Sequence, residues 1–327
     1  MKIKDQVLKL LEENKGSALS GEAIAKSLSV SRNAVWKSIK LLKQEGYSIS
    51  ATTNRGYCLE IDNDILSKQS IEGHLSKLSR HCSITVYKSL PSTNSLLKAM
   101  AAEGAPEGSV IISEEQTAGR GRLGRSFYSP TGTGIYMSIL LIPKFSIHKA
   151  LFITTAAAVA VARAIEKVFP QKEARIKWVN DIYCDNKKVC GILTESSLDF
   201  EGGSFEYAIL GIGINVTSPK EDFPEELKNI ATSLCSTDSY TSGARSLLAA
   251  EILNSFYELY EHLEDESLLR EYKSRSLLIG EKITILSREG SIPALALDID
   301  EEFRLKVQLE DGSIKALNSG EVSIRKG

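Results

Sequence analysis

The chain has 327 residues, of which 42% are hydrophobic and 25% charged, and its formal net charge is −2. This composition is that of an ordinary folded protein with two or three domains, and it excludes disordered, collagen-like and coiled-coil proteins. The near-neutral total conceals a segregation of charge. Residues 1–60 hold ten Lys and Arg against six Asp and Glu, whereas the rest of the chain is acidic. A small basic head predicts an anionic partner for that part alone, although a charge fluctuation of this size also arises by chance.

No segment has the pattern of a membrane span or a secretory signal. The longest uncharged apolar run, residues 150–162, is shorter than the roughly 20 residues that cross a bilayer. Charged residues interrupt every apolar run at the start of the chain. The five cysteines are an odd number without a C-x-x-C pair, which argues against a disulfide framework and a zinc ribbon. We therefore expect a cytoplasmic protein with reduced thiols and no membrane partner.

The first 60 residues predict three short helices and a hairpin. Apolar residues at helical spacing indicate the first helix, Ser20 can cap a second, and Ser31 can cap a third. Two residues separate the second helix from the third, which is typical of a helix-turn-helix. Two short strands around Asn54-Arg-Gly56 would form a wing. The sequence therefore predicts a winged helix-turn-helix domain in residues 1–62.

The third helix of this head turns polar side chains away from its apolar stripe. Such a helix fits the major groove of DNA, where Arg and Asn read base edges and Lys contacts phosphates. We predict that Gly21 to Lys40 bind DNA, especially Ser31, Arg32, Asn33, Trp36, Lys37 and Lys40. The alternative is a solvated face of a small helical bundle.

A polar stretch at residues 62–70 suits a linker, and residues 70–277 then mix strands with helices. We predict strands at residues 83–87, 109–113, 134–141, 174–178, 189–195 and 207–216, and helices at residues 151–169 and 247–263. This mixture indicates an α+β domain with a mixed sheet. From residue 278 to 327 only short alternating strands remain, with Asp311-Gly312 as a hairpin turn, so we expect a small β-barrel there.

The segment Gly119-Arg-Gly-Arg-Leu-Gly-Arg125 carries the strongest chemical signal. It contains the dinucleotide pattern G-x-G-x-x-G, but no helix is predicted after it, so the context of that motif is wrong. Its glycines let the backbone pass close to a ligand. The guanidinium groups of Arg120, Arg122 and Arg125 indicate a polyanion, because guanidinium pairs with phosphate and carboxylate through two parallel hydrogen bonds. The alternative is a flexible basic loop.

Three further segments place polar residues or glycines within or next to predicted strands and helices, and are therefore candidates for a binding site. Lys177-Trp-Val-Asn-Asp181 follows a predicted strand, and a returning strand would bring Lys188 to the same end of the sheet, where these polar side chains could form one site. The alternative is a hairpin with an exposed polar tip. Gly211-Ile-Gly-Ile-Asn215 places glycines in an apolar strand, which requires a close approach to its backbone and would aim Asn215 at a ligand. Ser92-Thr-Asn94 is a third polar segment that could contact a ligand. The alternative is that it only caps a helix.

Together these segments resemble biotin–protein ligases, specifically the bifunctional kind that also represses the biotin operon. The resemblance rests on Ser92-Thr-Asn94, Gln116, Gly119-Arg-Gly-Arg-Leu-Gly-Arg125, Lys177-Trp-Val-Asn-Asp181, Lys188-Val-Cys-Gly191 and Gly211-Ile-Gly-Ile-Asn215. It covers nearly the whole chain, because the head and the terminal barrel also stand in the family's positions. Lipoyl ligases look similar in fold but lack this head and this arginine loop.

The resemblance implies a class II synthetase-like ligase domain, an SH3-like barrel and a two-step reaction. The carboxylate of biotin would attack the α-phosphate of ATP to give biotinyl-5′-AMP and pyrophosphate. A lysine of the biotin carboxyl carrier protein would then attack the mixed anhydride. Because the substrate carboxylate is itself the nucleophile, the enzyme must hold two anions together and stabilise a charged transition state. ATP also implies Mg²⁺, for which the sequence names no ligands.

The resemblance also assigns roles to single residues. Lys188 and Arg122 would be catalytic. Biotin would be bound by Ser92, Thr93, Asn94, Gln116, Arg120, Gly121, Arg122, Lys188 and Gly191. The nucleotide would be bound by Arg120, Arg122, Arg125, Lys177, Trp178, Asn180, Asp181 and Asn215. The resemblance further implies operator DNA as a partner, with biotinyl-5′-AMP as the corepressor that orders the arginine loop and promotes a homodimer.

Three departures from the family pattern are visible. Val179 stands where the family usually has proline. Residues 298–303 replace a stretch in which glycines are usual. Lys187 lies next to Lys188, and the spacing to Gly191 favours Lys188 as the catalytic lysine.

Two other functions fit the same segments. One is a non-catalytic regulator that senses a small acid or a nucleotide through the central domain. The other is a lipoyl or octanoyl ligase, which a comparison of biotin with lipoate would separate.

Overall fold

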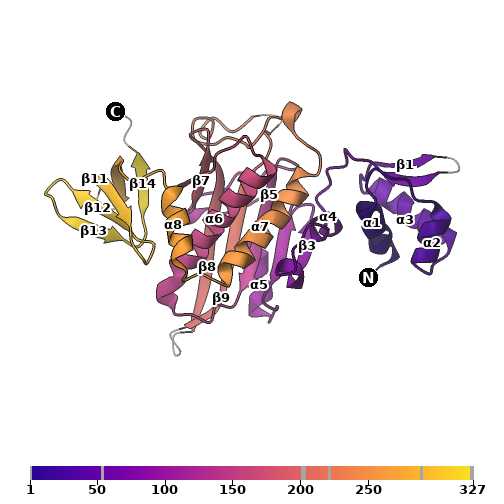
Figure 1. Cartoon of the computed structure of the whole chain (residues 1–327), viewed down its shortest axis with the longest axis horizontal. Helices are drawn as coiled ribbons and strands as arrows, with labels where there is room; N and C mark the ends of the chain where they lie inside the picture. Colours follow the sequence, from indigo (N-terminus) through magenta and orange to yellow (C-terminus); the bar gives the residue numbers. More distant parts are fainter. Residues whose placement is uncertain (1, 53–54, 200–203, 220–221, 288–289, 325–327) are drawn as a thin grey trace. The chain divides into compact units, whose positions relative to one another are not determined.

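The computed structural model describes residues 2–52, 55–199, 204–219, 222–287 and 290–324 (Figure 1). By their contacts these residues form two compact units. The first comprises Met1–Arg80 with Asp238–Glu251, and the second comprises His81–Thr237 with Ile252–Gly327. Each unit has a hydrophobic core of its own.

Three helices and a two-stranded hairpin form the head of the first unit. They are α1 (Ile3–Glu13), α2 (Gly21–Ser27), α3 (Arg32–Gln44), β1 (Ile49–Thr52) and β2 (Gly56–Leu59). Hydroxyls of Ser20 and Ser31 accept hydrogen bonds from backbone N–H groups in the first turns of α2 and α3, so both predicted caps are confirmed. Since β1 and β2 pair antiparallel, the winged helix-turn-helix is confirmed as well. Asn54, in the predicted turn of the wing, lies outside the described residues.

The polar stretch after the wing is part of the folded unit. A capping box starts a short helix, α4 (Lys68–Glu72). The carboxylate of Asp64 accepts a 3.0 Å hydrogen bond from Nε of Arg245, whose side chain is 4% exposed. Arg245 lies in the first turn of α7 (Ala244–Tyr260). The prediction of a linker at residues 62–70 is therefore wrong, because its polar side chains bind other parts of the unit.

The second unit is built on a seven-stranded sheet with the order β3-β4-β5-β9-β8-β7-β6. Its strands are β3 (Ser83–Tyr87), β4 (Ser109–Ser113), β5 (Gly134–Leu141), β6 (Arg175–Lys177), β7 (Asp181–Cys184), β8 (Lys187–Asp199) and β9 (Ser204–Asn215). Strands β3 and β4 are parallel, and the other neighbouring pairs are antiparallel. The predicted mixed sheet is thus confirmed.

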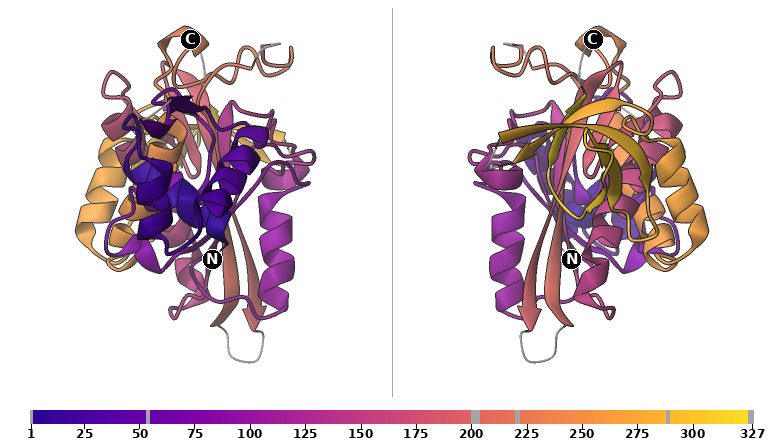
Figure 2. Two further views of the ribbon diagram at one scale, coloured as in Figure 1. Left: turned by 90° about the vertical axis from the view of Figure 1, so that its right-hand side faces the viewer. Right: turned by 90° about the vertical axis from the view of Figure 1, so that its left-hand side faces the viewer.

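Helices cover this sheet on both faces. Figure 2 shows α5 (Thr93–Ala102) on one side of the strands and α8 (Glu266–Ser274) on the other. The Ala-rich helix α6 (Ala150–Val168) packs on β6, β7 and β8, and it ends at Phe169, before a proline. Helix α8 was not predicted. None of the helices formed by the described residues combines the length and the apolar character needed to cross a membrane.

The sequence prediction missed one strand between residues 174 and 195. It placed a single polar turn there, whereas the chain forms β7 and makes two turns instead. The register of β7 against β8 shifts between Ile182 and Tyr183, so that Val189 has no partner in the ladder. This bulge changes the face on which the residues at the start of β8 point.

The chain ends in a separate five-stranded sheet. Its strands are β10 (Lys282–Ser287), β11 (Gly290–Ile299), β12 (Leu305–Leu309), β13 (Ile314–Leu317) and β14 (Glu321–Ile324). All pairs are antiparallel, in the order β13-β12-β11-β10-β14. Gly312 has a φ of +82°, in the predicted hairpin turn. The small antiparallel β domain is confirmed, strand β14 was missed, and closure into an SH3-like barrel stays a prediction.

Candidate functional site

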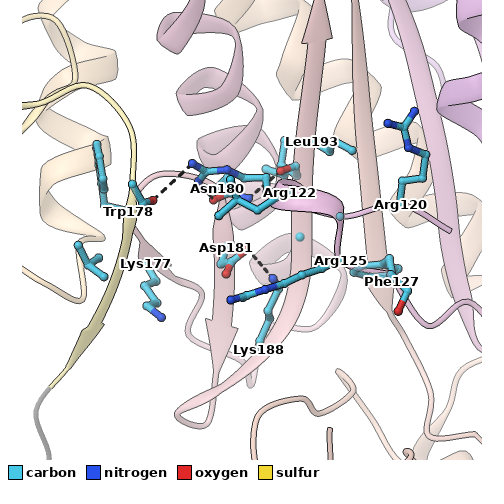
Figure 3. Close-up of a pocket in the computed structure, with 17 residues that line it drawn as sticks. Arg120, Arg122, Arg125, Phe127, Lys177, Trp178, Asn180, Asp181, Lys188 and Leu193 are labelled. Atoms are coloured by element: carbon cyan, nitrogen blue, oxygen red, sulfur yellow. Dashed lines mark hydrogen bonds and ion pairs between the residues drawn. The ribbon is translucent and has the colours of Figure 1, made fainter. Parts of the chain in front are cut away.

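A pocket of about 140 Å³ brings the arginine loop to the ends of β6, β7 and β8 (Figure 3). Its lining residues come from four segments: the loop itself, the β6–β7 turn, strand β8, and strand β14 with the residue just before it. They are Arg120, Gly121, Arg122, Leu123, Arg125, Ser126, Phe127, Lys177, Trp178, Asn180, Asp181, Lys188, Gly191, Ile192, Leu193, Gly320 and Val322. Ten of the residues predicted to bind substrates are among them.

The arginine loop folds back on itself. The backbone N–H of Gly121 donates to the carbonyl of Arg125 at 2.7 Å, and that of Phe127 donates to Gly119 at 2.9 Å. A Cβ on Gly119 would lie 2.4 Å from the carbonyl oxygen of Phe127, so only glycine fits there. Leu123, at the tip, has a φ of +55° and is 78% exposed. The loop therefore presents its arginines from a defined backbone conformation.

Arg122 points into the pocket and is held at both ends of its guanidinium. One nitrogen donates to Oδ1 of Asn180 at 2.7 Å, and the other donates to the carbonyl of Gly320 at 3.4 Å. The Asn180 amide nitrogen in turn donates to the carbonyl of Ile192 at 2.7 Å, so this asparagine is itself fixed. Such a chain of hydrogen bonds preorganises the positive charge before any substrate arrives.

The turn between β6 and β7 is tied to the terminal sheet and to α8. The indole nitrogen of Trp178 donates to the carbonyl of Phe303 at 2.9 Å. The hydroxyl of Tyr272 donates to the carbonyl of Val179 at 3.0 Å. Burial raises the pKa of Tyr272, and the nearby carboxylate of Asp181 raises it further, so this hydroxyl remains a donor. Backbone and side-chain hydrogen bonds thus hold this turn at both Trp178 and Val179.

Lys188 lies opposite the arginine loop, with its ammonium 2.6 Å from Oδ1 of Asp181. The bulge in β8 explains this position, because residues three apart in a regular strand point to opposite faces. Here a Cβ on Gly191 would lie 3.2 Å from the Lys188 ammonium. Lys187 instead donates to the carbonyl of Lys228 and does not line the pocket. The geometry thus separates the two adjacent lysines.

The residues predicted to hold the polar atoms of biotin form a second cluster beside the pocket. Gln116 Oε1 accepts from the backbone N–H of Thr93 at 2.8 Å, and Gln116 Nε2 donates to Ser129 at 3.0 Å. The hydroxyl of Ser138 donates to Thr93 Oγ1 at 2.7 Å and to Asn94 Oδ1 at 2.6 Å. This biotin-side cluster does not line the pocket, but it lies in the same unit.

Ser92 has the capping role that the sequence left open as the alternative. Its hydroxyl accepts a 3.4 Å hydrogen bond from the backbone N–H of Ser95 and starts α5. The cap also places Thr93 and Asn94 in the first turn of the helix, where both are buried against the sheet. The cap therefore fixes where Thr93 and Asn94 enter the biotin-side cluster.

The glycines of β9 make room for side chains of the protein itself. A Cβ on Gly211 would lie 2.2 Å from Oδ1 of Asn94, and one on Gly213 would lie 2.6 Å from the ring of Phe127. The predicted close approach to this strand is therefore confirmed. Asn215, at the strand's end, donates to the carbonyl of Thr232 at 3.2 Å and is not among the residues lining the pocket.

Neither Cys184 nor Cys190, the two cysteines nearest to Lys188 in sequence, is activated as a nucleophile. All five cysteines of the chain lie within the described residues and are free thiols. Burial raises the pKa of Cys190, which is next but one to Lys188, and it raises the pKa of Cys184 to about 12. A thiol must lose its proton to attack, so these two cysteines contribute packing only.

The sequence did not single out several residues that build the site. Glu195 pairs with Arg120 at 3.1 Å and accepts a 2.9 Å hydrogen bond from Asn94. Phe127 lies over the glycines of β8 and β9, and Gly320 binds Arg122. A glutamate in the apolar strand Ile192-Leu-Thr-Glu195 was a usable signal, because an acidic residue there requires a partner.

The predicted DNA face is a separate surface on the head. The side chains of Arg32, Asn33, Trp36, Lys37 and Lys40 are all exposed, whereas Ser31 caps the helix. Trp36 is 51% exposed, and the ammonium of Lys40 lies 5.5 Å from the centre of its ring. An open groove runs between the start of α3 and the wing, lined by Ser20, Gly21, Glu22, Arg32, Asn33, Trp36, Ala51, Thr52, Gly56 and Tyr57.

Comparison with known proteins matches three segments of this chain to known families, in the order of its folded parts. The HTH domain matches residues 4–58, the Biotin/lipoate A/B protein ligase family matches residues 86–215, and the Biotin protein ligase C terminal domain matches residues 278–325. The solved structure of the biotin protein ligase from Aquifex aeolicus in complex with biotin and ATP has a TM-score of 0.60 and 28% identity, over 75% of this chain and 99% of that one.

Two bifunctional ligase/repressors are similar to this chain over nearly its full length. The bifunctional ligase/repressor BirA of Bacillus subtilis (strain 168) is 34% identical over 98% of both chains. The bifunctional ligase/repressor BirA of Escherichia coli (strain K12) is 28% identical over 95% of this chain and 94% of that one. With the head, the pocket and the terminal sheet all in place, this chain belongs to the family of bifunctional biotin ligases and repressors.

Proposed function

We propose that the chain is an ATP-dependent biotin–protein ligase that forms biotinyl-5′-AMP and transfers biotin to a lysine of biotin carboxyl carrier protein. The observation that carries the proposal is the convergence of Arg122, Arg125 and Lys188 on one pocket (Figure 3). Three cations around a small cavity suit a reaction that brings a carboxylate and a triphosphate together. The family's known ligases support biotin and ATP as the two substrates.

In the first step an oxygen of the biotin carboxylate attacks the α-phosphorus, and the bond to the pyrophosphate oxygen breaks. Lys188 and Arg122 would hold the attacking carboxylate and the α-phosphate, and they would stabilise the charge that develops on the phosphate oxygens. Asp181 would keep the Lys188 ammonium in place until the substrates arrive, since the two groups lie 2.6 Å apart.

In the second step the amine of the carrier lysine attacks the carbonyl carbon of the mixed anhydride. The bond from that carbon to the phosphate oxygen breaks, AMP leaves, and the amine loses its proton. The chain supplies position and charge rather than a covalent nucleophile, which agrees with the raised pKa of Cys190.

The assignments of the single residues follow the two parts of the site. Biotin's polar atoms would bind at Ser92, Thr93, Asn94 and Gln116, with Gly121 and Gly191 leaving room for its chain. The nucleotide would lie toward Lys177, Trp178, Asn180 and Asp181, with Arg125 on its phosphates. Asn215 would contribute at the end of β9, although its amide now binds Thr232.

ATP would enter with Mg²⁺, whose ligands are largely the phosphates themselves. Within the described ranges, no three His, Cys, Asp or Glu side chains are grouped so as to hold a metal ion. The described part of the chain therefore offers Mg²⁺ no such group of ligands, and both steps of the reaction rely on the cations of the pocket.

The head would bind operator DNA through α3 and make the chain a repressor of biotin genes. Arg32 and Asn33 would read base edges, and Lys37 and Lys40 would contact phosphates. Biotinyl-5′-AMP would act as corepressor by ordering the arginine loop and promoting a homodimer. A DNA partner and a carrier-protein substrate would both be met in the cytoplasm, and this supports our expectation of a cytoplasmic protein.

The decisive test is mass spectrometry of the protein after incubation with biotin, ATP and apo carrier protein. We expect biotinyl-5′-AMP bound to the protein and a carrier whose mass has increased by one biotinyl group. Lipoate in place of biotin should give neither product. Binding of biotin without either product would leave a non-catalytic sensor, whereas products with lipoate alone would indicate a lipoyl-type ligase.

The repressor role has its own test. Sedimentation velocity with biotin and ATP should show a shift from monomer to dimer, and the dimer should bind the biotin operator more tightly than the unliganded protein. An unchanged sedimentation coefficient with bound adenylate would exclude dimerisation as the switch.

A further inference from the structure

Glu195 lies between the biotin-side cluster and the arginine loop. Its Oε2 accepts a 2.9 Å hydrogen bond from the amide nitrogen of Asn94, and its Oε1 lies 3.1 Å from a guanidinium nitrogen of Arg120. The Glu195 side chain is only 21% exposed, whereas that of Arg120 is 50% exposed. One carboxylate on β8 thus binds a helix on one side and a loop on the other.

Arg120 differs in direction from the other arginines of its loop. Figure 3 shows its guanidinium pointing away from Lys188 and Asp181, whereas Arg125 extends toward Lys188 and Arg122 lies against Asn180. Its charge is also neutralised by Glu195, whereas Arg122 is held by the neutral groups of Asn180 and Gly320. Arg120 is therefore poorly placed to bind a substrate anion with its side chain.

We propose that Glu195 is a positioning residue and that Arg120 acts through it rather than on the substrate. This inference rests on the proposed ligase function and deepens it. The Glu195–Arg120 pair fixes the start of the arginine loop, and the Glu195–Asn94 bond fixes the biotin-side cluster. The carboxylate is the physical link between the two parts of the site.

The link acts first on the orientation of Asn94. Because an ionised carboxylate accepts hydrogen bonds but cannot donate them, Glu195 requires the amide nitrogen of Asn94 to face β8, and Oδ1 of Asn94 then faces Ser138, at 2.6 Å. Oδ1 also fills the space where a Cβ on Gly211 would lie, 2.2 Å away. Without a carboxylate at position 195 the amide nitrogen keeps a long hydrogen bond of 3.4 Å to the carbonyl of Leu193. The amide would then turn over more easily, and turning over would interchange the donor and the acceptor that it offers to a ligand.

The link acts second on charge. A half-buried carboxylate beside a pocket for a carboxylate substrate would repel that substrate. Arg120 cancels this repulsion. Loss of Arg120 should then weaken the binding of biotin even though its guanidinium does not touch biotin, and loss of Glu195 should remove the need for Arg120.

A double-mutant cycle on biotin affinity tests the proposal. Isothermal titration calorimetry would be run with biotin on the wild type, Glu195→Gln, Arg120→Gln and the double variant. We expect each single substitution to weaken biotin binding about tenfold, as the loss of one charge-assisted bond does. The double variant should bind within about twofold of the weaker single variant, because both act through one interaction.

Two outcomes overturn the proposal. If the effects multiply, the residues act independently; if Glu195→Gln leaves biotin binding unchanged while Arg120→Gln abolishes it, Arg120 binds the substrate directly. Glu206→Gln is the matched control, because Glu206 is exposed on the neighbouring strand β9 and accepts a 2.6 Å hydrogen bond from the hydroxyl of Ser197. Circular dichroism confirms folding, and Arg120→Gln, on an exposed loop, keeps the test open if Glu195→Gln misfolds.

A kinetic measurement separates positioning from a merely structural role. Glu195→Gln should raise the KM for biotin about tenfold and leave the KM for ATP within twofold, because the biotin-side cluster is disturbed and the nucleotide side is not. Equal changes in both constants would contradict the proposal. The calorimetric cycle reports on biotin binding even if the wild type makes no adenylate, so failure of the ligase function and failure of this inference remain distinguishable.

Discussion

The cations of the DNA face and the cations of the pocket are chemically alike but are held differently. On α3 the side chains of Arg32, Lys37 and Lys40 extend into solvent from one face of a helix. In the pocket Arg122 and Lys188 are each fixed by a side chain of the same unit. Exposed cations bind a polyanion by releasing its counterions, whereas fixed cations act through geometry prepared in advance. Substitutions should therefore reduce DNA binding by degrees and catalysis abruptly.

The largest effect is expected at Lys188. Lys188→Ala should lower the rate of adenylate formation about 10²–10³-fold, since one preorganised donor to the developing charge is lost. The measurement is pyrophosphate release with saturating biotin and ATP. Lys187→Ala is the control, because the neighbouring lysine binds the carbonyl of Lys228 and lies outside the pocket lining. Equal losses in the two variants would refute the assignment.

A smaller effect is expected on the DNA face. Arg32→Ala should weaken operator binding about tenfold or more, as the loss of a base contact does. Lys37→Ala should weaken all DNA alike and reduce the slope of log affinity against log salt by about 0.9. Fluorescence anisotropy at several salt concentrations measures both. Neither variant should change pyrophosphate release, and a loss of catalysis in Arg32→Ala would contradict the separation of the two cation sets.

The smallest effect is expected for Glu271, whose carboxylate pairs with two arginines outside both cation sets and contributes to stability only. Glu271 on α8 bonds Arg163 and Arg275. Burial raises the pKa of Glu271, but the hydrogen bonds and charges of these two arginines outweigh it, and the pKa is lowered. Because its pKa is lower in the folded than in the unfolded protein, the ionised Glu271 stabilises the fold at any pH above the unfolded-state pKa of about 4.3. This stabilisation is lost as the pH falls through the folded-state pKa.

Glu271→Gln should therefore lower the melting temperature by roughly 2 °C at pH 7. The difference from the wild type should shrink below about pH 4. Differential scanning calorimetry between pH 3 and pH 7 measures this. Glu261→Gln, an exposed glutamate near the end of α7, should show no such trend. A difference that stayed constant with pH would mean that packing, and not the two arginines, accounts for the effect.

Local signals in the sequence predicted most of the fold. Serines at positions 20 and 31 mark helix starts because a hydroxyl satisfies backbone N–H groups that the helix leaves unpaired. The apolar runs of β4 and β5 and the alanines of α6 report burial directly. Strand β7 was missed because it has only four residues and begins with Asp181. The polar residues before α4 resembled a linker, since nothing near them in sequence reveals that Asp64 meets Arg245.

The chemistry of the site was predictable, but the choice of partners within it was not. The arginine loop and the glycines of β9 indicated anions and close approach. The bulge at Val189 decides that Lys188 and not Lys187 enters the pocket, and a bulge depends on the register of two strands. The pairing of Arg120 with Glu195 joins residues that are 75 positions apart and lie on different elements. Such pairings arise from tertiary structure, which local patterns do not encode.

The hydrogen bonds from Trp178 to Phe303 and from Arg122 to Gly320 also have a consequence for how the protein is made. Both bonds join the pocket to the last strands of the chain. During synthesis on a ribosome, the arginine loop and β8 emerge long before these acceptors exist. The nascent chain must therefore pass through a stage in which the head is folded while the pocket still lacks one wall. The DNA face of the head is therefore complete before the pocket is, and the corepressor that the pocket would make can form only after the last strands have folded.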